Sequence, residues 1–229
     1  MNGLIDEFYR NFINESRWKL LLSGLGVTLE ITAFALLLGV VLGFFVAIVR
    51  SAHDKTGKLG ILNRLCTLYT TVIRGTPVVV QLMLIYYGVF ASVNISKVLV
   101  AVLAFGLNSG AYVSEIVRSG IMAIDEGQFE AGRSLGFSYA QTMWYIVMPQ
   151  AFKNVLPALG NEFITLLKET SVSGYIAMED LTKAGDIIRS RTFSPFMPLI
   201  AVAVIYLIMV GIFTRLLALM ERRLRNSER

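Results

Sequence analysis

The chain has 229 residues, of which 55% are hydrophobic and 16% are charged, and its formal net charge at pH 7 is +5. A soluble domain is typically about 45–50% apolar and about 25% charged, so this composition excludes an ordinary soluble domain and also intrinsic disorder. A single cysteine, Cys66, and a single histidine, His53, exclude a disulfide scaffold and a zinc or iron–sulfur site built from these residues.

The first 21 residues form a charged segment ahead of the apolar part of the chain. They lack the roughly 7–15-residue apolar stretch of a signal peptide, so insertion is expected to depend on the first spanning segment. Apolar side chains recur at helical spacing at Leu4, Ile5, Phe8, Phe12 and Ile13. The segment is therefore either a short amphipathic helix lying on the membrane or an exposed tail.

Five predominantly apolar segments follow, each long enough for a helix to cross the hydrocarbon core of about 30 Å. Their approximate bounds are Leu22–Val49, Leu65–Val93, Val98–Val117, Gln150–Leu167 and Phe196–Leu219. The second is interrupted by the sequence from Arg74 to Pro77. None shows the alternation of strands or of a β-barrel. We predict an all-α membrane protein with five transmembrane helices, built as one transmembrane domain over residues 1–229.

The distribution of Lys and Arg predicts the orientation of these helices. The loop Arg50–Arg64 and the tail Met220–Arg229 each carry four basic residues, and such clusters mark the cytoplasmic side of a membrane rather than a nucleic-acid surface. With five spans, the N-terminus then lies outside and the C-terminus in the cytoplasm, as does the loop 118–149. The loop Lys168–Pro195 would lie outside, although its four basic residues argue mildly against this.

The five predicted spans differ in polarity. The third and fifth are apolar enough to face lipid or to pack inside the protein. The fourth contains a series of polar residues and one proline: Gln150, Lys153, Asn154, Pro157, Asn161, Glu162 and Thr165. Because each unpaired polar group costs several kcal/mol in hydrocarbon, the fourth helix must line a protein interior or a water-filled path.

Two glycines of the first span, Gly39 and Gly43, have the GxxxG spacing. This spacing suits close approach of two helices. Membrane helices also tolerate glycine without such a role, so the sequence leaves both interpretations open.

The loop 118–149 carries signals for two short helices. Asp125 with Gln128, and Ser138 with Gln141, have the spacing of capping boxes that begin a helix. Gly136 suits the left-handed position that ends the first helix, and Pro149 limits or kinks the second. Two capped helices make a rigid protrusion, which predicts a cytoplasmic docking element.

This loop resembles the EAA loop of membrane subunits of ATP-binding-cassette (ABC) importers. That pattern is Glu-Ala-Ala, three residues, Gly, nine residues, Ile, one residue and Leu-Pro. The chain has Glu130-Ala131-Gly132, then Gly136, Ile146 and Met148-Pro149 at the same spacing. Gly132 and Met148 depart from the pattern without removing its helix–glycine–helix design. The resemblance implies that an ATPase-coupling helix includes Glu130, Ala131, Gly132, Leu135 and Gly136.

Other segments resemble the polar amino-acid permeases of the same superfamily. These are Arg74–Pro77 with Gln81-Leu82, Ala111–Arg118, Gly127-Gln128, and Lys168–Ser171. The resemblance extends from about Leu22 to Arg223. It implies the type I ABC importer transmembrane fold, in a multi-pass protein of a prokaryotic cell membrane. It also implies a second permease subunit, identical or closely related, a cytoplasmic ABC ATPase dimer, and an extracellular or periplasmic solute-binding protein.

The chain itself lacks a nucleotide-binding motif. Gly57-Lys58 is followed by Leu59, and Ala52 stands where a phosphate-binding loop needs its first glycine. No Ser–His–Asp or Cys–His arrangement suggests a catalytic nucleophile. The sequence therefore predicts a non-catalytic subunit without ATPase activity of its own, with ATP and Mg²⁺ bound by the partner ATPase. A secondary transporter is the rival interpretation, but neither internal repeats nor a filter motif supports it.

Ionisable residues within spans are candidates for function. Arg74 and Glu115 are expected to have structural roles, and Glu115 could pair with Arg118 one helical turn away. Glu162, near mid-membrane beside Asn161, is either a substrate-binding residue or a structural partner.

The predicted substrate follows from the acids in the outer half and middle of the membrane. Glu30, Glu162 and the neutral Asn161 are the candidate substrate-binding residues. A buried carboxylate without a partner is costly, and a cationic side chain would supply that partner. We therefore favour basic amino acids, namely arginine, lysine and histidine. Glutamine or another neutral polar amino acid is the alternative, as is a role for Glu162 in holding the substrate ammonium group.

Overall fold

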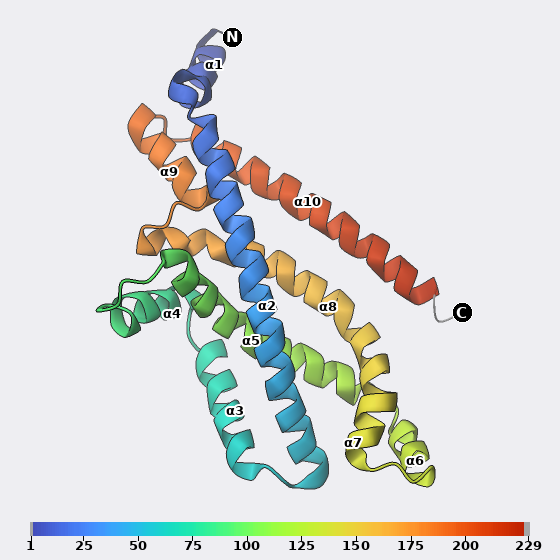
Figure 1. Cartoon of the computed structure of the whole chain (residues 1–229). Helices are drawn as coiled ribbons and strands as arrows, with labels where there is room; N and C mark the ends of the chain where they lie inside the picture. Colours follow the sequence, from blue (N-terminus) through green and yellow to red (C-terminus); the bar gives the residue numbers. More distant parts are fainter. Residues whose placement is uncertain (1, 227–229) are drawn as a thin grey trace.

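The computed structural model describes residues 2–226, and the regular elements within them are helices (Figure 1). The α-helices are α1 (Asn2–Phe8), α2 (Trp18–Thr56), α3 (Gly60–Arg74), α4 (Val78–Leu84), α5 (Lys97–Met122), α6 (Glu126–Ser134), α7 (Tyr139–Thr142), α8 (Met148–Glu169), α9 (Leu181–Thr192) and α10 (Met197–Asn226). Short π or 3-10 turns are η1 (Tyr9–Ile13), η2 (Asn14–Ser16), η3 (Ile85–Val89), η4 (Met143–Val147) and η5 (Thr170–Ile176). The prediction of an all-helical chain is confirmed for these residues.

Helix α2 is longer than the first predicted span. It begins at Trp18 and continues to Thr56 over 39 residues, where Gly57 adopts a left-handed φ of 68° and ends it. The predicted loop Arg50–Arg64 is therefore wrong in extent, because most of its residues belong to α2 and α3. Basic residues such as Arg50 and Lys55 fit into a helix as well as most residues do. Their charge therefore predicts the side of the membrane on which they lie, but it does not predict where the helix ends.

Helices α2 and α5 pack closely through the two glycines of the GxxxG sequence. A Cβ atom at Gly39 would lie 2.8 Å from Ser109 Cβ, and one at Gly43 would lie 2.6 Å from Val113 Cβ. Since these distances are shorter than side chains allow, both glycines are needed for the approach of the two backbones. The interpretation as a packing motif is confirmed.

The second predicted span is two helices joined at a sharp corner. The axes of residues 60–74 and 78–89 differ by 107°, and the corner falls at the Gly75–Pro77 interruption. The Gln81 side chain stabilises it by donating to the carbonyl oxygens of Ile73 (2.7 Å) and Thr76 (3.0 Å). Proline and glycine end the helix here, and an amide side chain satisfies the carbonyl groups that are freed.

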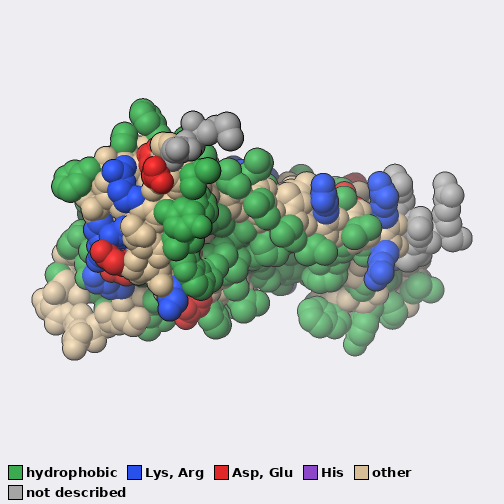
Figure 2. All heavy atoms as spheres, turned by 90° about the horizontal axis from the view of Figure 1, so that it is seen from above, with side chains coloured by type: hydrophobic (Ala, Val, Ile, Leu, Met, Phe, Trp, Pro, Cys, Tyr) green, Lys and Arg blue, Asp and Glu red, His purple; other side chains and the backbone are tan. Residues whose placement is uncertain are grey.

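By length and apolarity, three helices among the described residues could cross a membrane: α2, α5 and α10. The bent pair makes a fourth if it forms one span. Helix α5 is the most buried of the three, so it packs inside the protein rather than facing lipid. Helix α10 is largely exposed and diverges from the other helices (Figure 1), and hydrophobic side chains cover much of its surface in Figure 2. It extends beyond the predicted end at Leu219 to Asn226, whereas Arg229 of the predicted basic tail lies outside the described residues.

The N-terminal segment and the predicted loop 168–195 meet at one end of the molecule (Figure 1). Thr192 Oγ1 donates to Asn11 Oδ1 at 2.6 Å, which fixes η1 to the end of α9. Asp180 is buried and caps α9 by accepting from the N–H groups of Thr182 and Lys183. Burial raises the pKa of this carboxyl group to about 6. The loop expected here is thus a helix with its own cap.

Candidate functional site

A groove lies between α5 and α8. A cavity of about 430 Å³ opens between the two helices, lined by Glu115, Ile116, Ser119, Gly120, Ala123, Asn154 and Ala158. Among the polar residues of α8, Asn154 lines this cavity, whereas Gln150, Lys153, Asn161 and Thr165 are exposed, so the water-filled path along the fourth helix stays a prediction. The close packing of α2 against the other side of α5 holds one wall of this groove.

Glu162 is held at the upper part of the α5–α8 contact. Ser109 Oγ of α5 donates a hydrogen bond of 2.8 Å to Glu162 Oε1, and Ser109 is itself buried against Gly39. The Glu162 side chain is half-buried, and within residues 2–226 no Lys or Arg lies within ion-pair distance of it. Among the described residues, the hydrogen-bond partner of this carboxylate is therefore neutral.

Neither of the other two predicted substrate residues bonds to this carboxylate. Asn161 is exposed, and its amide donates to the carbonyl of Pro157 in its own helix at 3.1 Å. Glu30 is exposed on α2, nine residues before Gly39, which places it about 13 Å along the helix axis from the level of Ser109. Glu30 and Glu162 therefore lie at different levels of the protein.

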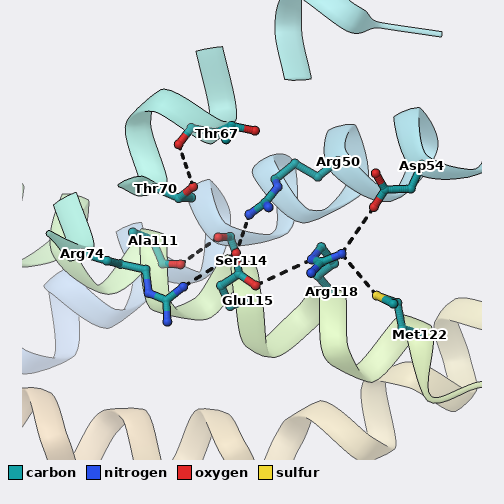
Figure 3. A network of polar contacts seen from close by, with 10 residues as sticks. All are labelled: Arg50, Asp54, Thr67, Thr70, Arg74, Ala111, Ser114, Glu115, Arg118 and Met122. Carbon is teal, nitrogen blue, oxygen red and sulfur yellow. Dashed lines mark hydrogen bonds and ion pairs between the residues drawn. The ribbon is translucent and has the colours of Figure 1, made fainter. Parts of the chain in front are cut away.

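A cluster of charged residues lies nearer the other end of α5. Glu115 receives a hydrogen bond from Arg50 of α2, and its oxygens lie 3.8 Å from Arg74 of α3 and 3.6 Å from Arg118 (Figure 3). Arg118 also pairs with Asp54 at 3.3 Å. We call these five residues the Glu115 cluster. It joins α2, α3 and α5, and it confirms the structural interpretation of Glu115 and Arg74, including the Glu115–Arg118 pair.

Sequence reasoning missed two residues of these sites, Ser109 and Arg50. Each contributes a hydrogen bond to a carboxylate that is 53 or 65 residues away in the chain. The available signal was indirect, because a charge within a span requires a partner. Nothing local in the sequence identifies which residue that partner is.

The second candidate site is the protrusion formed by α6 and α7, which we call the knob. Helix α6 begins at Glu126, directly after the predicted cap Asp125, and ends at Ser134, so Leu135 and Gly136 lie beyond its end and not within the predicted coupling helix. Its end has both hydrogen bonds of a Schellman motif, Phe137 N–H to Gly132 O and Gly136 N–H to Arg133 O. Gly136 has a φ of 81°, which confirms the predicted left-handed turn.

The caps of the knob agree with the sequence at one of two places. Ser138 and Gln141 form the predicted capping box at the start of α7. Asp125 caps α6 by accepting from the N–H of Gly127 at 2.7 Å, but Gln128 does not complete a box. The Gln128 side chain accepts instead from Gln150 Nε2 at 3.3 Å, which ties the knob to α8.

The knob presents most of the predicted coupling residues to solvent. Four of them are exposed, namely Glu130, Ala131, Leu135 and Gly136, with Leu135 at 72%. Gly132 is buried, because a Cβ atom there would lie 2.6 Å from Thr142 Cγ2. Glycine in place of the alanine of the EAA pattern thus lets α6 approach Thr142.

Helix α2 reaches the knob through Lys55. Its ammonium group lies 2.7 Å from Glu126 Oε1 and 5.2 Å from the centre of the Phe129 ring. The hydrogen bond from Lys55 lowers the pKa of Glu126 below its ordinary value. A cavity of about 370 Å³ lies between these elements. The knob is therefore joined to α8, which lines the groove, and to α2, which packs against α5.

Comparison with known proteins agrees with this arrangement. The family described as "Binding-protein-dependent transport system inner membrane component" matches residues 39–226. The chain is 38% identical over 210 residues to the arginine transport system permease protein ArtQ of Bacillus subtilis, covering 91% of this chain and 94% of ArtQ. It is 36% identical over 206 residues to the putative glutamine transport system permease protein GlnP of Rickettsia typhi, covering 89% and 92%.

A solved structure described as an amino acid ABC transporter with histidines is also similar. It is 44% identical to the chain, with a TM-score of 0.84 over 93% of this chain and 98% of the other. The match with the family extends over most of the chain and includes the groove, the Glu115 cluster and the knob. The chain is therefore a non-catalytic, multi-pass protein of a bacterial inner or cytoplasmic membrane. It belongs to the inner membrane components of binding-protein-dependent ABC transport systems, as an amino-acid permease of the polar amino-acid family.

Proposed function

We propose that this permease imports basic amino acids and that Glu162 reads their cationic side chain. The observation that carries this proposal is the half-buried Glu162 carboxylate, which has Ser109 as a neutral partner and no cation within ion-pair distance among the described residues. Partial burial makes an unpaired carboxylate costly. A guanidinium or ammonium group of the substrate would neutralise it.

The contrast with Glu115 supports this assignment. Glu115 has three arginines around it, so it has no need of a substrate cation. The names of the relatives are compatible with a cationic substrate, since one is an arginine permease and one structure contains histidines. They also support the alternative, since another relative is a putative glutamine permease.

Glutamine is the second candidate because the neutral groups near Glu162 suit it. Ser109 and Asn161 can both hydrogen-bond to an amide side chain. In that case Glu162 would hold the substrate ammonium group, which every α-amino acid carries. The two candidates therefore differ in which part of the substrate the carboxylate contacts.

The proposed topology has five spans, formed by α2, the bent pair α3–α4, α5, α8 and α10. Helix α8 is about 33 Å long for its 22 residues, and a second subunit would cover the polar side chains that it exposes. The α2–α3 turn and the knob lie at one end, which we assign to the cytoplasm, and α1 and α9 lie at the other (Figure 1). The N-terminus is then outside and the C-terminus inside.

The partners follow from this orientation. The exposed face of α6 would dock to a cytoplasmic ATPase dimer, which holds the ATP and Mg²⁺ that the transport cycle requires. A second permease subunit would complete the translocation path beside the α5–α8 groove. A solute-binding protein would deliver the amino acid to the end that carries α9.

The test is substrate binding by the Glu162→Gln variant of the complete permease–ATPase complex. Arginine and lysine are expected to bind more than tenfold more weakly, whereas glutamine binding changes by less than about threefold, because only the cationic substrates lose a charge partner. Glu30→Gln is the matched control and should alter neither. Equal losses for arginine and glutamine would assign Glu162 to the ammonium group, and a wild type that prefers glutamine would overturn the basic assignment.

A further inference from the structure

Exposed aromatic side chains gather at the end of the molecule opposite the knob. They come from the N-terminal segment, from the first residue of α2 and from the link between α9 and α10. Figure 2 looks onto this end, where hydrophobic side chains lie at the surface beside charged ones. Between 43% and 90% of each of these side chains is exposed, so their rings contribute little to the core of the chain. We call them the aromatic set: Phe8, Tyr9, Trp18, Phe193 and Phe196.

Phe193 is held in a backbone conformation that its side chain disfavours. It directly follows α9, with a left-handed φ of 52° and ψ of 29°. Glycine usually occupies this position, because a Cβ atom is costly there. The Phe193 side chain is 90% exposed, so packing within the described part of the chain does not offset that cost. A bulky ring kept exposed at a strained position indicates a contact outside the chain.

Hydrogen bonds join the N-terminal segment to the link between α9 and α10. Asn11 accepts from Thr192 and lies 3.7 Å from Met197 Sδ through its amide nitrogen. Ser194 Oγ donates to Glu7 Oε1 at 2.5 Å. Asn11, Thr192 and Ser194 are buried. These bonds exclude the exposed tail that the sequence left open for this segment, and they fix the two parts of the chain as one unit.

This unit lies where two helices long and apolar enough to cross a membrane begin. Helix α10 starts at Met197, which Asn11 contacts, and α2 starts at Trp18. Aromatic rings are enriched at the headgroup level of membrane proteins, because their apolar body and polar surroundings suit that region. Lys19 lies 5.8 Å from the Trp18 ring and supplies a cation for lipid phosphate groups. The position and chemistry of the set therefore favour a phospholipid surface.

The charged part of α9 is separate from the aromatic set. A cavity of about 460 Å³ is lined there by Lys183, Asp186 and Arg189, together with Tyr175. None of the five aromatic side chains lines it. A protein that approaches through water is steered by charge, so this cavity suits a protein partner better than the exposed rings do.

We propose that the N-terminal segment and the link between α9 and α10 lie in the headgroup region of the membrane, with the aromatic set inserted among the phospholipids. The exposed Leu4 and Ile5 of α1 extend this apolar surface, as in a helix that lies on a membrane. The insertion anchors α9 at the membrane surface and leaves its charged cavity open to water. This contact is independent of which amino acid the permease transports.

The first experiment is photo-crosslinking in the permease–ATPase complex, with the solute-binding protein present. The complex is placed in nanodiscs of phosphatidylethanolamine and phosphatidylglycerol, and p-benzoylphenylalanine is incorporated at Phe193 or Phe196. Tyr175 is the matched control position, because it is 63% exposed at the same end but lines the charged cavity. We expect at least about fivefold more lipid adduct at the two phenylalanine positions than at Tyr175, measured by mass spectrometry.

A second measurement needs no unnatural side chain. The fluorescence of Trp18 is obtained as the difference between wild type and Trp18→Phe in the same complex. Lipids brominated near the headgroup should quench this fluorescence more strongly than lipids brominated near the bilayer centre. Equal quenching by both lipids, or none, would place Trp18 away from the headgroup region and contradict the proposal.

The crosslinks also distinguish lipid from a protein partner. Adducts of Phe193 and Phe196 with the solute-binding protein would overturn the proposal and assign the aromatic set to that partner. As much lipid adduct at Tyr175 as at the two phenylalanine positions would overturn it as well, and so would the absence of lipid adducts at both. A preference of the wild type for glutamine over arginine would contradict the proposed substrate and leave these results unchanged.

Discussion

The knob and the groove are built from different kinds of contact. The helix ends of the knob are held by bonds between residues only two to five positions apart, such as Asp125 with Gly127 and Phe137 with Gly132. The polar groups in and near the groove are held by bonds between residues far apart in the chain, such as Arg50 with Glu115 and Ser109 with Glu162. The knob can therefore move as a rigid unit, whereas the geometry of the groove depends on how α2, α5 and α8 are placed. This difference suits a protein in which docking drives helix movement and helix movement changes a binding site.

The largest expected effect comes from breaking the local design of the knob. Gly136→Val places a β-branched residue at a φ of 81°, which costs at least about 1–2 kcal/mol. The end of α6 is then displaced, and the ATPase is expected to dissociate or to lose its coupling to transport by tenfold or more. Copurification of the ATPase and ATP-driven uptake in proteoliposomes measure this.

Asparagine is the matched substitution at this position, because it tolerates the left-handed conformation better than valine. Gly136→Asn should keep most of the coupling, and both variants should insert in the membrane normally. Full coupling in Gly136→Val would show that the Schellman turn is not required for docking.

A smaller effect is expected from removing the central carboxylate of the Glu115 cluster. Glu115→Gln leaves Arg50, Arg74 and Arg118 with Asp54 as their remaining acid. Because Glu115 and Arg50 are mostly buried, we expect a loss of about 1–3 kcal/mol in stability, measured by thermal unfolding of the complex in detergent. Glu126→Gln serves as the control, since its bond to Lys55 is exposed. Equal stability of Glu115→Gln and wild type would contradict a long-range ionic contact holding the groove.

The smallest effect concerns packing inside the knob. Gly132→Ala should cost about 1–2 kcal/mol in the docking of the ATPase, because the added Cβ overlaps the Thr142 side chain. Thr142→Ala removes the overlapping atoms, so the double variant should recover most of this loss. A double-mutant cycle on ATPase affinity measures the coupling, and additive losses would show that the two residues do not limit each other.

The sequence predicted the knob better than the groove, because the contacts of the knob are local in the chain and those of the groove are not. The left-handed Gly136 and the Ser138 cap are properties of short sequences, so the knob could be predicted closely. The start of α6 was predicted correctly at Asp125, but its capping box is incomplete because Gln128 bonds to Gln150 of α8 rather than to its own helix end. The groove was predicted only as a polar face on the fourth helix, since its partners Ser109 and Arg50 come from other helices.

The interruption of the second span shows the same limit on a smaller scale. Gly75 and Pro77 predict that a helix stops, but the 107° corner also depends on Gln81, which binds the freed carbonyl groups. Glu30 and Glu162 looked alike in the sequence as acids in apolar spans. In the structure the two acids lie apart, because α2 packs against α5 through Gly39 and Gly43 and leaves Glu30 exposed. In the sequence, only the spacing of these two glycines indicated which face of α2 is packed.

The most direct test measures two quantities in the same proteoliposomes: the number of ATP molecules hydrolysed per amino acid imported, and the ratio of arginine to glutamine uptake. The comparison is between wild type, Gly136→Val and Glu162→Gln, each with the partner ATPase and the solute-binding protein. We predict that Gly136→Val raises the ATP consumed per amino acid without changing the uptake ratio. Glu162→Gln should lower the ratio of arginine to glutamine without weakening the ATPase attachment. A changed uptake ratio in Gly136→Val, or an unchanged ratio in Glu162→Gln, would contradict the account in which the knob couples the ATPase and Glu162 selects the substrate.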